Sequence, residues 1–337
     1  MINVAMWGKA LRVIPHVSKQ EWGELDIVSR WLVATRSAVF VMTAASAVMG
    51  GLLAYRDGYF SWMFFAACMV GLVFAHATNN LINDLTDHIK GVDRDNYFRA
   101  RYGPQPLEHG LMSKGELGVY ILVTGLIALL AGIFLVAQTG WIAAALLAAG
   151  AFFVLFYTWP LKFIGLGEPS VLLVWGPLMV GGTYYVTTGG HWSWHVVLIS
   201  LVYALGPTCV LFGKHSDKRK EDAAKGIHTL PVILGEKAAR MSIIAMLAAQ
   251  FILLVPVVIS GALSPVILIS FAALREFRLI YKILIQPRPS TRPDDFPEDA
   301  WPLYLVAHTF IYNRRFSLYF LSGLLIDTGL KVSGLLS

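Results

Sequence analysis

Four polar side chains that can ligate a metal ion recur at helical spacing within one short stretch of the chain. They are Asn80, Asn83, Asp84 and Asp87. Their positions, i, i+3, i+4 and i+7, predict that all four lie on one face of a helix. Because two carboxylates and two amides offer only oxygen ligands, the pattern favours Mg²⁺, which in proteins usually also binds phosphate groups.

A second group of charged residues lies between residues 214 and 222. On one continuous helix it would form two faces, with Lys214, Asp217 and Glu221 on the first and His215, Lys218 and Asp222 on the second. Oxygen ligands for a metal ion and cations for a phosphate group are both present. The pattern predicts a second region that binds phosphate.

The composition is that of a membrane protein. Only 14% of the 337 residues are charged, 56% are hydrophobic, and the mean hydropathy is +0.62, whereas soluble domains carry about 25% charged residues. These values exclude a disordered chain and argue against an ordinary cytosolic enzyme. Both cysteines, Cys68 and Cys209, lie in apolar runs, which excludes a disulfide framework and a zinc site.

Long windows without charged residues predict an all-α protein with nine transmembrane helices, each of about 20 residues. The ninth window contains Asp327. Residues 1–30 are charged and lack a compact apolar core, so we expect no cleavable signal peptide, and Trp7, Leu11 and Ile14 suggest an interfacial helix there. The spans are expected near residues 31–55, 60–83, 117–137, 141–159, 170–188, 195–213, 239–260, 263–284 and 316–334.

The positive charges predict the orientation. All lysines and arginines except Arg36, Arg56 and Lys331 fall on the side of the N-terminus, and the positive-inside rule places this side in the cytoplasm. Both acidic groups follow even-numbered helices on this side. This arrangement is typical of an internal duplication that brings two acidic sites to one cavity, as when two metal ions bind one diphosphate. The alternative is that both groups are solvated loop charges, but polar groups at the end of an apolar helix are costly without a role.

The first acidic group, Asn83-Asp84-Leu85-Thr86-Asp87, resembles the NDxxD signature of the UbiA superfamily of intramembrane prenyltransferases. The second family signature, DxxxD before a Gly and then Thr-Leu, is recognisable as Asp222, Gly226, Thr229 and Leu230. The resemblance covers about residues 30–335. Its 1,4-dihydroxy-2-naphthoate branch is similar at Lys90-Gly91-Val92-Asp93, Gly176-Pro177 and Gly182-Thr183-Tyr184-Tyr185-Val186.

The second signature departs from the family pattern in its register. Four residues before Asp222 the chain has Lys218, and the nearest acid, Asp217, is one residue further back. Residues i and i+5 of a regular helix point about 140° apart. Either the helix is distorted at this point, or Asp217 pairs with Glu221.

The resemblance implies nine helices around a central cavity and Mg²⁺-dependent transfer of a polyprenyl group from a prenyl diphosphate to an aromatic acceptor. It implies catalytic roles for Asp84, Asp87, Asp217 and Asp222, with metal ligands drawn from Asn83, Asp84, Asp87, Asp93, Asp217, Glu221 and Asp222. The diphosphate would be bound by Arg36, Arg101, Lys162, Lys214 and Lys218. Asn80, Tyr157 and Tyr184 would contact the substrate, where aromatic faces stabilise a carbocation.

The expected organisation is a cytoplasmic segment, residues 1–30, followed by one transmembrane domain, residues 31–337, in a bacterial or archaeal cell membrane. The expected partners are the lipid bilayer, a prenyl diphosphate and a hydrophobic or aromatic acceptor, with no nucleic acid. Two alternatives are a membrane terpene cyclase, which needs no acceptor, and a transporter with a cation site. The transporter is disfavoured because the charged groups cluster at helix ends and no pair of broken helices marks a midplane site.

Overall fold

The computed structural model describes residues 2–92 and 103–335, and within these ranges the chain forms helices and no β-strand. This confirms the predicted all-α class. The chain divides into two compact units. We call Met1–Ala45 with Ala66–Trp159 the N-terminal unit, and Ser46–Phe65 with Pro160–Ser337 the C-terminal unit.

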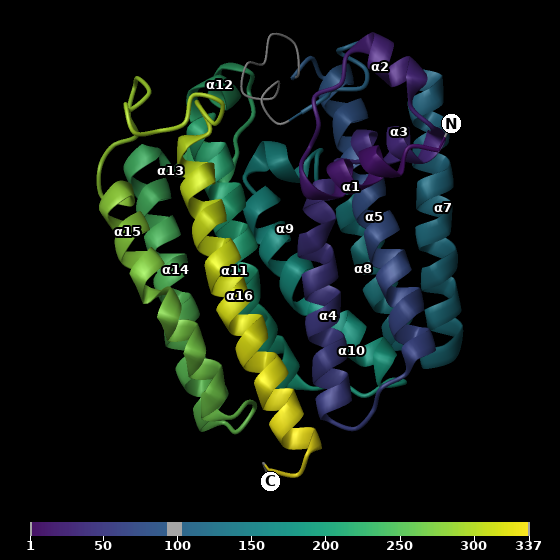
Figure 1. The fold of residues 1–337 in the computed structure, drawn as a ribbon, viewed down its shortest axis with the longest axis vertical. Coiled ribbons are helices and arrows are strands. Elements are labelled where there is room, and N and C mark those ends of the chain that lie inside the picture. The colour runs from purple at the N-terminus through teal and green to yellow at the C-terminus, as the bar shows by residue number, and fades with distance from the viewer. Residues whose placement is uncertain (1, 93–102, 336–337) are drawn as a thin grey trace. The chain divides into compact units, whose positions relative to one another are not determined.

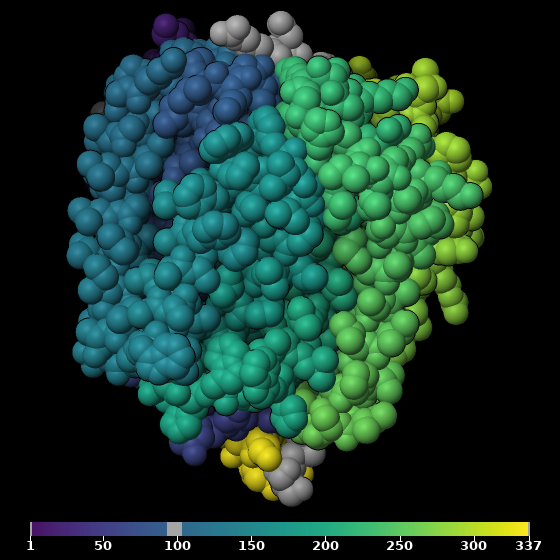
Figure 2. Space-filling view, turned by 180° about the vertical axis from the view of Figure 1, so that it is seen from behind, coloured from purple at the N-terminus to yellow at the C-terminus, as the bar shows by residue number. Residues whose placement is uncertain are grey.

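The N-terminal unit combines short helices with long apolar ones (Figure 1). Exposed apolar side chains such as Leu122, Leu130 and Phe152 cover the outer faces of α7 and α8, which Figure 2 shows in blue and teal. Helices that are apolar on their outer faces suit a lipid environment. The elements are α1 (Val4–Arg12), α2 (Lys19–Glu24), α3 (Ile27–Ala34), α5 (Trp62–Ile89), α7 (Lys114–Thr139) and α8 (Trp141–Phe156).

Asp26 ties α1 to α3. It precedes the first residue of α3 and accepts hydrogen bonds from the backbone amides of Val28 and Ser29, each at 3.0 Å, which satisfies donors that a helix start leaves unpaired. The indole Nε1 of Trp7 donates to the same carboxylate at 3.1 Å. These bonds, the one from the Ser29 hydroxyl above all, hold the pKa of Asp26 well below its usual value. A helix does therefore form where the spacing of Trp7 predicts one.

The first predicted membrane helix, 31–55, is interrupted at Arg36. Helix α3 ends at Ala34, and the chain continues as η1 (Ser37–Val39) and α4 (Phe40–Arg56). Arg36 itself has φ 56° and ψ 49°, a left-handed backbone. This conformation is uncommon outside glycine, and it tends to persist where the surrounding structure holds it for a functional reason.

Helix α11 (Trp194–Asp217) is the centre of the C-terminal unit. It packs against α14 (Glu236–Ile259) and α16 (Tyr304–Val332), as Figure 1 shows. Gly213 permits the close approach of α16, since a Cβ atom there would lie 3.0 Å from the Cα of Val306. The first amides of α16 therefore come close to the end of α11. The other elements are η2 (Leu161–Ile164), α9 (Gly167–Leu173), η3 (Val174–Gly181), α10 (Gly182–Thr187), α12 (Arg219–Ala224), α13 (Leu230–Leu234), η4 (Pro265–Ala273) and α15 (Leu274–Leu284).

Six helical stretches of the described chain are long and apolar enough to cross a membrane, against the nine that the sequence predicts. Helix α8 has only 16 residues, and α16 carries charges. Helix α16 begins at Tyr304, twelve residues before the ninth predicted span, 316–334. The prediction starts too late because Arg314 and Arg315 lie in the first part of this helix and end the uncharged window. The six are Ser37–Arg56, Trp62–Ile89, Lys114–Thr139, Gly167–Thr187, Trp194–Asp217 and Glu236–Ile259.

Asp327, which we expected to interrupt the last helix, is a structural residue within the C-terminal unit. Its side chain is fully buried and forms an ion pair with Nε of Arg56 at the end of α4. Its second oxygen accepts a hydrogen bond of 2.7 Å from the backbone amide of Ser264. The carboxylate therefore connects three segments that are far apart in the sequence.

We predict that this ion pair contributes strongly to stability. Replacing either Arg56 by Met or Asp327 by Leu leaves one buried charge without its partner, and should lower the free energy of unfolding by about 3–5 kcal/mol. The double variant should lose much less than the sum of the two single losses, because no uncompensated charge remains. Unfolding by sodium dodecyl sulfate in mixed micelles measures this. Strictly additive losses would contradict the prediction, and Lys331→Met is the matched control.

Candidate active site

The first acidic group lies on the last turns of α5. This helix continues to Ile89, six residues beyond the predicted end of the second span, so the group is helical as its spacing predicts. Asp84 and Asp87 are buried, with 3% and 6% of their surface exposed. Two carboxylates one turn apart, buried at a helix end, are costly unless cations or hydrogen-bond donors compensate them.

Arg36 supplies a cation to this face. Its guanidinium lies 3.2 Å from Oδ1 of Asp84 and donates a hydrogen bond of 3.0 Å to the main-chain carbonyl of Asn80. The left-handed backbone of Arg36 ends α3 and directs the next segment into η1. The sequence predicts Arg36 as a residue that contacts the diphosphate, and the structure places it directly beside the NDxxD signature.

The asparagines fasten α5 to its neighbours within the N-terminal unit. Asn80 donates from Nδ2 to the carbonyl of Thr35 at 2.8 Å, and Asn83 donates from Nδ2 to Oγ1 of Thr158 at 3.0 Å. Since the nitrogen end of the Asn83 amide faces Thr158, its oxygen end is the one available to a cation. The sequence predicts Asn80 as a substrate contact, and in the structure its amide nitrogen is bonded to the backbone at the end of α3.

The oxygen ligands on α5 fit a magnesium ion whose remaining ligands are phosphate oxygens. Mg²⁺ is usually bound by one or two carboxylates together with substrate phosphates, and Asn83, Asp84 and Asp87 supply oxygen atoms of these kinds. Within residues 2–92 and 103–335, no three His, Cys, Asp or Glu side chains gather as a ready metal site. Two predicted residues, Asp93 and Arg101, lie outside the described residues.

The second acidic group belongs to the C-terminal unit and does not form one continuous helix. Helix α11 ends at Asp217, Lys218 has φ −98° and ψ 9°, and α12 begins at Arg219. Of the two alternatives that the register left open, the structure therefore has the distorted helix. The two faces predicted for this segment do not exist as such, and Glu221 is exposed on α12.

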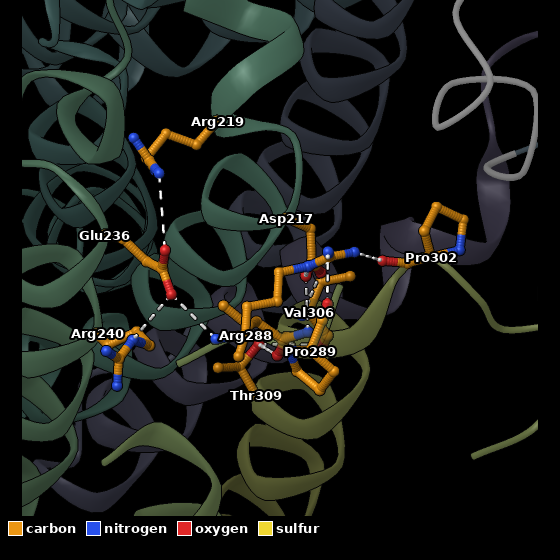
Figure 3. Close-up of polar contacts among 10 residues, drawn as sticks. Asp217, Arg219, Glu236, Arg240, Arg288, Pro289, Pro302, Val306 and Thr309 are labelled. Atoms are coloured by element: carbon orange, nitrogen blue, oxygen red, sulfur yellow. Dashed lines mark hydrogen bonds and ion pairs between the residues drawn. The ribbon is translucent and has the colours of Figure 1, made fainter. Parts of the chain in front are cut away.

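Asp217 caps α16 (Figure 3). Its Oδ1 accepts hydrogen bonds from Nε of Arg288 at 2.8 Å and from the amide of Leu305 at 3.0 Å. Its Oδ2 accepts one of 3.0 Å from the amide of Val306. Amides in the first turn of a helix have no partner within the helix, and this carboxylate supplies one from another helix.

Arg288 extends this contact into a wider polar network. Its guanidinium donates to the carbonyl of Pro302 at 2.7 Å and lies 4.9 Å from the ring centre of Trp301. Its backbone amide donates to Glu236 at 3.0 Å, and Glu236 also lies 3.7 Å from Arg219, as Figure 3 shows. The network joins the segment between α15 and α16 to the ends of α11, α12 and α14.

Lys218 and Asp222 form an ion pair of 3.0 Å. Asp222 is buried, with 3% of its surface exposed, and its backbone amide donates to the carbonyl of Lys218 at 2.8 Å. The sequence predicts both as ligands of the diphosphate and its metal ion, and the structure brings them together. Lys214, also predicted for the diphosphate, is half-buried one turn before this pair on α11.

Glu168 is a buried residue that the sequence analysis missed. One of its oxygens lies 2.6 Å from Nδ1 of His215, and the other accepts from the amide of Leu230 at 3.3 Å. Both side chains of the Glu168–His215 pair are almost fully buried. The available signal was a single acid at the start of a long apolar window, since an acid there needs a partner.

The remaining predicted residues are not all brought together. Lys162 is buried in η2, 8% exposed, and Tyr157 is half-buried next to Thr158 at the end of α8. The hydroxyl of Tyr184 donates to Asp57 at 2.8 Å, and α10, which carries Tyr184, lies at the opposite end of the C-terminal unit from α12 (Figure 1). Tyr184 is thus far from Asp222.

Comparison with known proteins gives the same family that the motifs indicate. The model of the UbiA prenyltransferase family matches residues 43–295. The 1,4-dihydroxy-2-naphthoate octaprenyltransferase of Haemophilus influenzae is 29% identical over 225 residues, which cover 63% of this chain and 71% of that protein. The naphthoate acceptor in this name belongs to that protein.

Two solved structures share the fold. The apo structure of a UbiA homolog from Aeropyrum pernix K1 has a TM-score of 0.63 at 19% identity and covers 85% of this chain and 97% of that chain. A UbiA homolog from Archaeoglobus fulgidus bound to GPP and Mg²⁺ has a TM-score of 0.53 at 16% identity and covers 85% and 98%.

The family match and the named relatives define a prenyltransferase, and the apolar helices make it an integral, multi-pass membrane protein. The chain belongs to the UbiA prenyltransferase family.

The cap on α16 leads to a prediction about Asp217. Replacing Asp217 by Ala leaves Arg288 and two helix amides without their acceptor, and should lower the free energy of unfolding by about 3 kcal/mol. Hydrogen exchange should speed up at the amides of Leu305 and Val306. Glu221→Ala, four residues away on an exposed face, should change stability by less than about 0.5 kcal/mol. Unchanged exchange at both amides in Asp217→Ala would show that the cap is not formed.

Proposed function

We propose that this prenyltransferase is Mg²⁺-dependent and moves a polyprenyl group from a prenyl diphosphate to an aromatic acceptor. The observation that carries the proposal is the buried pair of carboxylates on α5, Asp84 and Asp87, with the guanidinium of Arg36 beside them. Buried carboxylates next to a cation suit a ligand that combines a metal ion with a diphosphate.

The α5 residues would hold the metal ion through Asn83, Asp84 and Asp87. When bound, Mg²⁺ neutralises the negative charge that develops on a departing diphosphate. Thr158 keeps the Asn83 amide in the orientation that presents its oxygen, and Arg36 lies where a guanidinium can contact both Asp84 and a phosphate oxygen. Partners of this kind usually matter almost as much as the ligands themselves.

We propose that the cations of the C-terminal unit, Lys162, Lys214 and Lys218, bind phosphate oxygens of the prenyl diphosphate. The support is in the sequence, since each acidic group follows an even-numbered predicted helix, an arrangement typical of an internal duplication. In the described structure, Lys162 is buried and Lys218 is paired with Asp222. A lysine ammonium is a compact charge with three donors and is suited to phosphate oxygens.

Once the diphosphate departs, an allylic carbocation needs an aromatic environment and protection from water. Tyr157 directly precedes Thr158, whose hydroxyl accepts a hydrogen bond from Asn83, so its backbone lies near the acidic face of α5. We therefore keep Tyr157 as a substrate contact. We leave Tyr184 out, because its hydroxyl is bonded to Asp57 at the other end of the C-terminal unit.

For the acceptor we propose a dihydroxynaphthoate-like compound, which makes the product a quinone precursor. The support is the name of the Haemophilus influenzae relative, together with the segments around Lys90 and Gly182 that resemble the naphthoate branch. We also propose that the N-terminus and the mouth of the site are cytoplasmic, in a bacterial or archaeal cell membrane. The distribution of lysine and arginine supports this orientation.

The metal assignment predicts the behaviour of Asp87→Ala. The variant should insert and fold, but release diphosphate at least about 100-fold more slowly, because one less ligand stabilises the charge on the leaving group. Release is measured with purified protein, a prenyl diphosphate and increasing Mg²⁺. As a control, Asp299, an exposed acid of the C-terminal unit, is replaced by Ala, and this variant should behave as wild type. Wild-type turnover of Asp87→Ala at saturating Mg²⁺ would contradict the assignment.

The need for an acceptor separates a transferase from a terpene cyclase. With donor and Mg²⁺ alone, we expect little diphosphate release, since the diphosphate is set free only when an acceptor traps the carbocation. Adding 1,4-dihydroxy-2-naphthoate should start release and give a product whose mass contains both parts. Full-rate release from the donor alone, with a cyclic hydrocarbon or alcohol as product, would replace the transferase with a cyclase and leave the metal site in place.

A further inference from the structure

The position four residues before Asp222 is occupied by a cation. Lys218 stands where the second family signature has its first acid, and its Nζ lies 3.0 Å from Oδ1 of Asp222. The backbone amide of Asp222 also donates to the carbonyl of Lys218, so two bonds hold the residues together. A magnesium ion on Asp222 would have to lie beside this ammonium and would be repelled by it.

Asp217 cannot take the place of the missing acid. Both of its oxygens accept hydrogen bonds, three in all, from Arg288, Leu305 and Val306. Its side chain has no exposed surface, and Mg²⁺ gives up its water reluctantly. Ligation of a metal ion by Asp217 would therefore require the start of α16 to detach.

The other acids near this group do not complete a metal site either. Glu221 is exposed on α12, and Glu168 is bonded through both oxygens, to His215 and to the amide of Leu230. The second oxygen of Asp222 is buried and has no hydrogen-bond partner among the described residues. Asp222 is thus a single carboxylate whose charge is balanced by Lys218.

Lys218 has donors left for a ligand. An ammonium group has three protons, and Asp222 accepts one of them. The side chain is 13% exposed, so it is partly desolvated yet reachable. A partly desolvated lysine held in place by a carboxylate is a strong site for a phosphate oxygen.

We infer that the C-terminal unit recognises the diphosphate through Lys218, held by Asp222, and not through a second metal ion. At the second signature, then, a lysine stands in place of a magnesium site. This inference rests on the proposed function, because it concerns how the chain binds its prenyl diphosphate. It also gives Asp222 a distinct role as a positioning residue that holds the lysine.

Counting bound metal ions tests the inference directly. The probes are Mn²⁺ and farnesyl thiolodiphosphate, whose carbon–sulfur bond does not ionise, added to the full-length protein in nanodiscs. Electron paramagnetic resonance should count one Mn²⁺ per chain in wild type and two in Lys218→Asp, which restores a pair of acids. Two Mn²⁺ per wild-type chain would overturn the inference.

A second variant keeps the test independent of the folding of Lys218→Asp. Lys218→Gln should weaken analogue binding at least 10-fold and leave the count at one Mn²⁺, and Lys220→Gln, exposed on α12, should change neither. Unchanged analogue binding by Lys218→Gln would also overturn the inference. If wild type binds neither Mn²⁺ nor the analogue, the proposed function itself has failed, which is a different result from a count of two.

Discussion

Most of the structure around the site follows from the cost of burying a carboxylate in a low-dielectric environment. Several acids of the described chain are almost fully buried, and each has a specific cation or set of donors. Asp84 lies beside Arg36, Asp217 beside Arg288, Asp222 beside Lys218 and Asp327 beside Arg56. Since an uncompensated buried charge is costly, each pairing constrains the path of the backbone that supplies the partner.

The backbone irregularities occur where this pairing requires them. Arg36 adopts a left-handed conformation that separates α3 from η1, and its guanidinium reaches Asp84. At Lys218 the helix breaks between α11 and α12, which leaves Asp217 beneath α16 and Lys218 against Asp222. In each unit, then, a break in a helix places one charged group of the candidate site, and at Arg36 the left-handed backbone is of the kind found at functional positions.

The spacing of residues was enough to predict that the first acidic group is helical. Asn83, Asp84 and Asp87 are on one helix, so the 3.6-residue period alone places them on one face. Apolar windows likewise predicted most helices, although α5 and α11 run past the last apolar residue to include the charged motifs. The start of α16 was missed because Arg314 and Arg315, which are exposed on this helix, look like loop residues in the sequence.

Partners distant in sequence could not be predicted. Asp217 is bonded to Leu305 and Val306 across 88 and 89 residues, and Asp327 to Arg56 across 271. No local period connects such pairs, and only the packing of α16 against α11 at Gly213 brings the first set together. The prediction of Asp217 as a metal ligand came from the resemblance to the second family signature, whereas its environment is that of a helix cap.

The central claim is that the carboxylates of α5 hold the metal ion that contacts the diphosphate. Pulsed electron–nuclear double resonance on Mn²⁺-loaded protein with farnesyl thiolodiphosphate measures this contact as a coupling between the manganese electron spin and phosphorus. The account predicts a clear phosphorus coupling in wild type that disappears in Asp84→Asn. A phosphorus coupling of undiminished strength in Asp84→Asn, or bound Mn²⁺ without any phosphorus coupling in wild type, would contradict it.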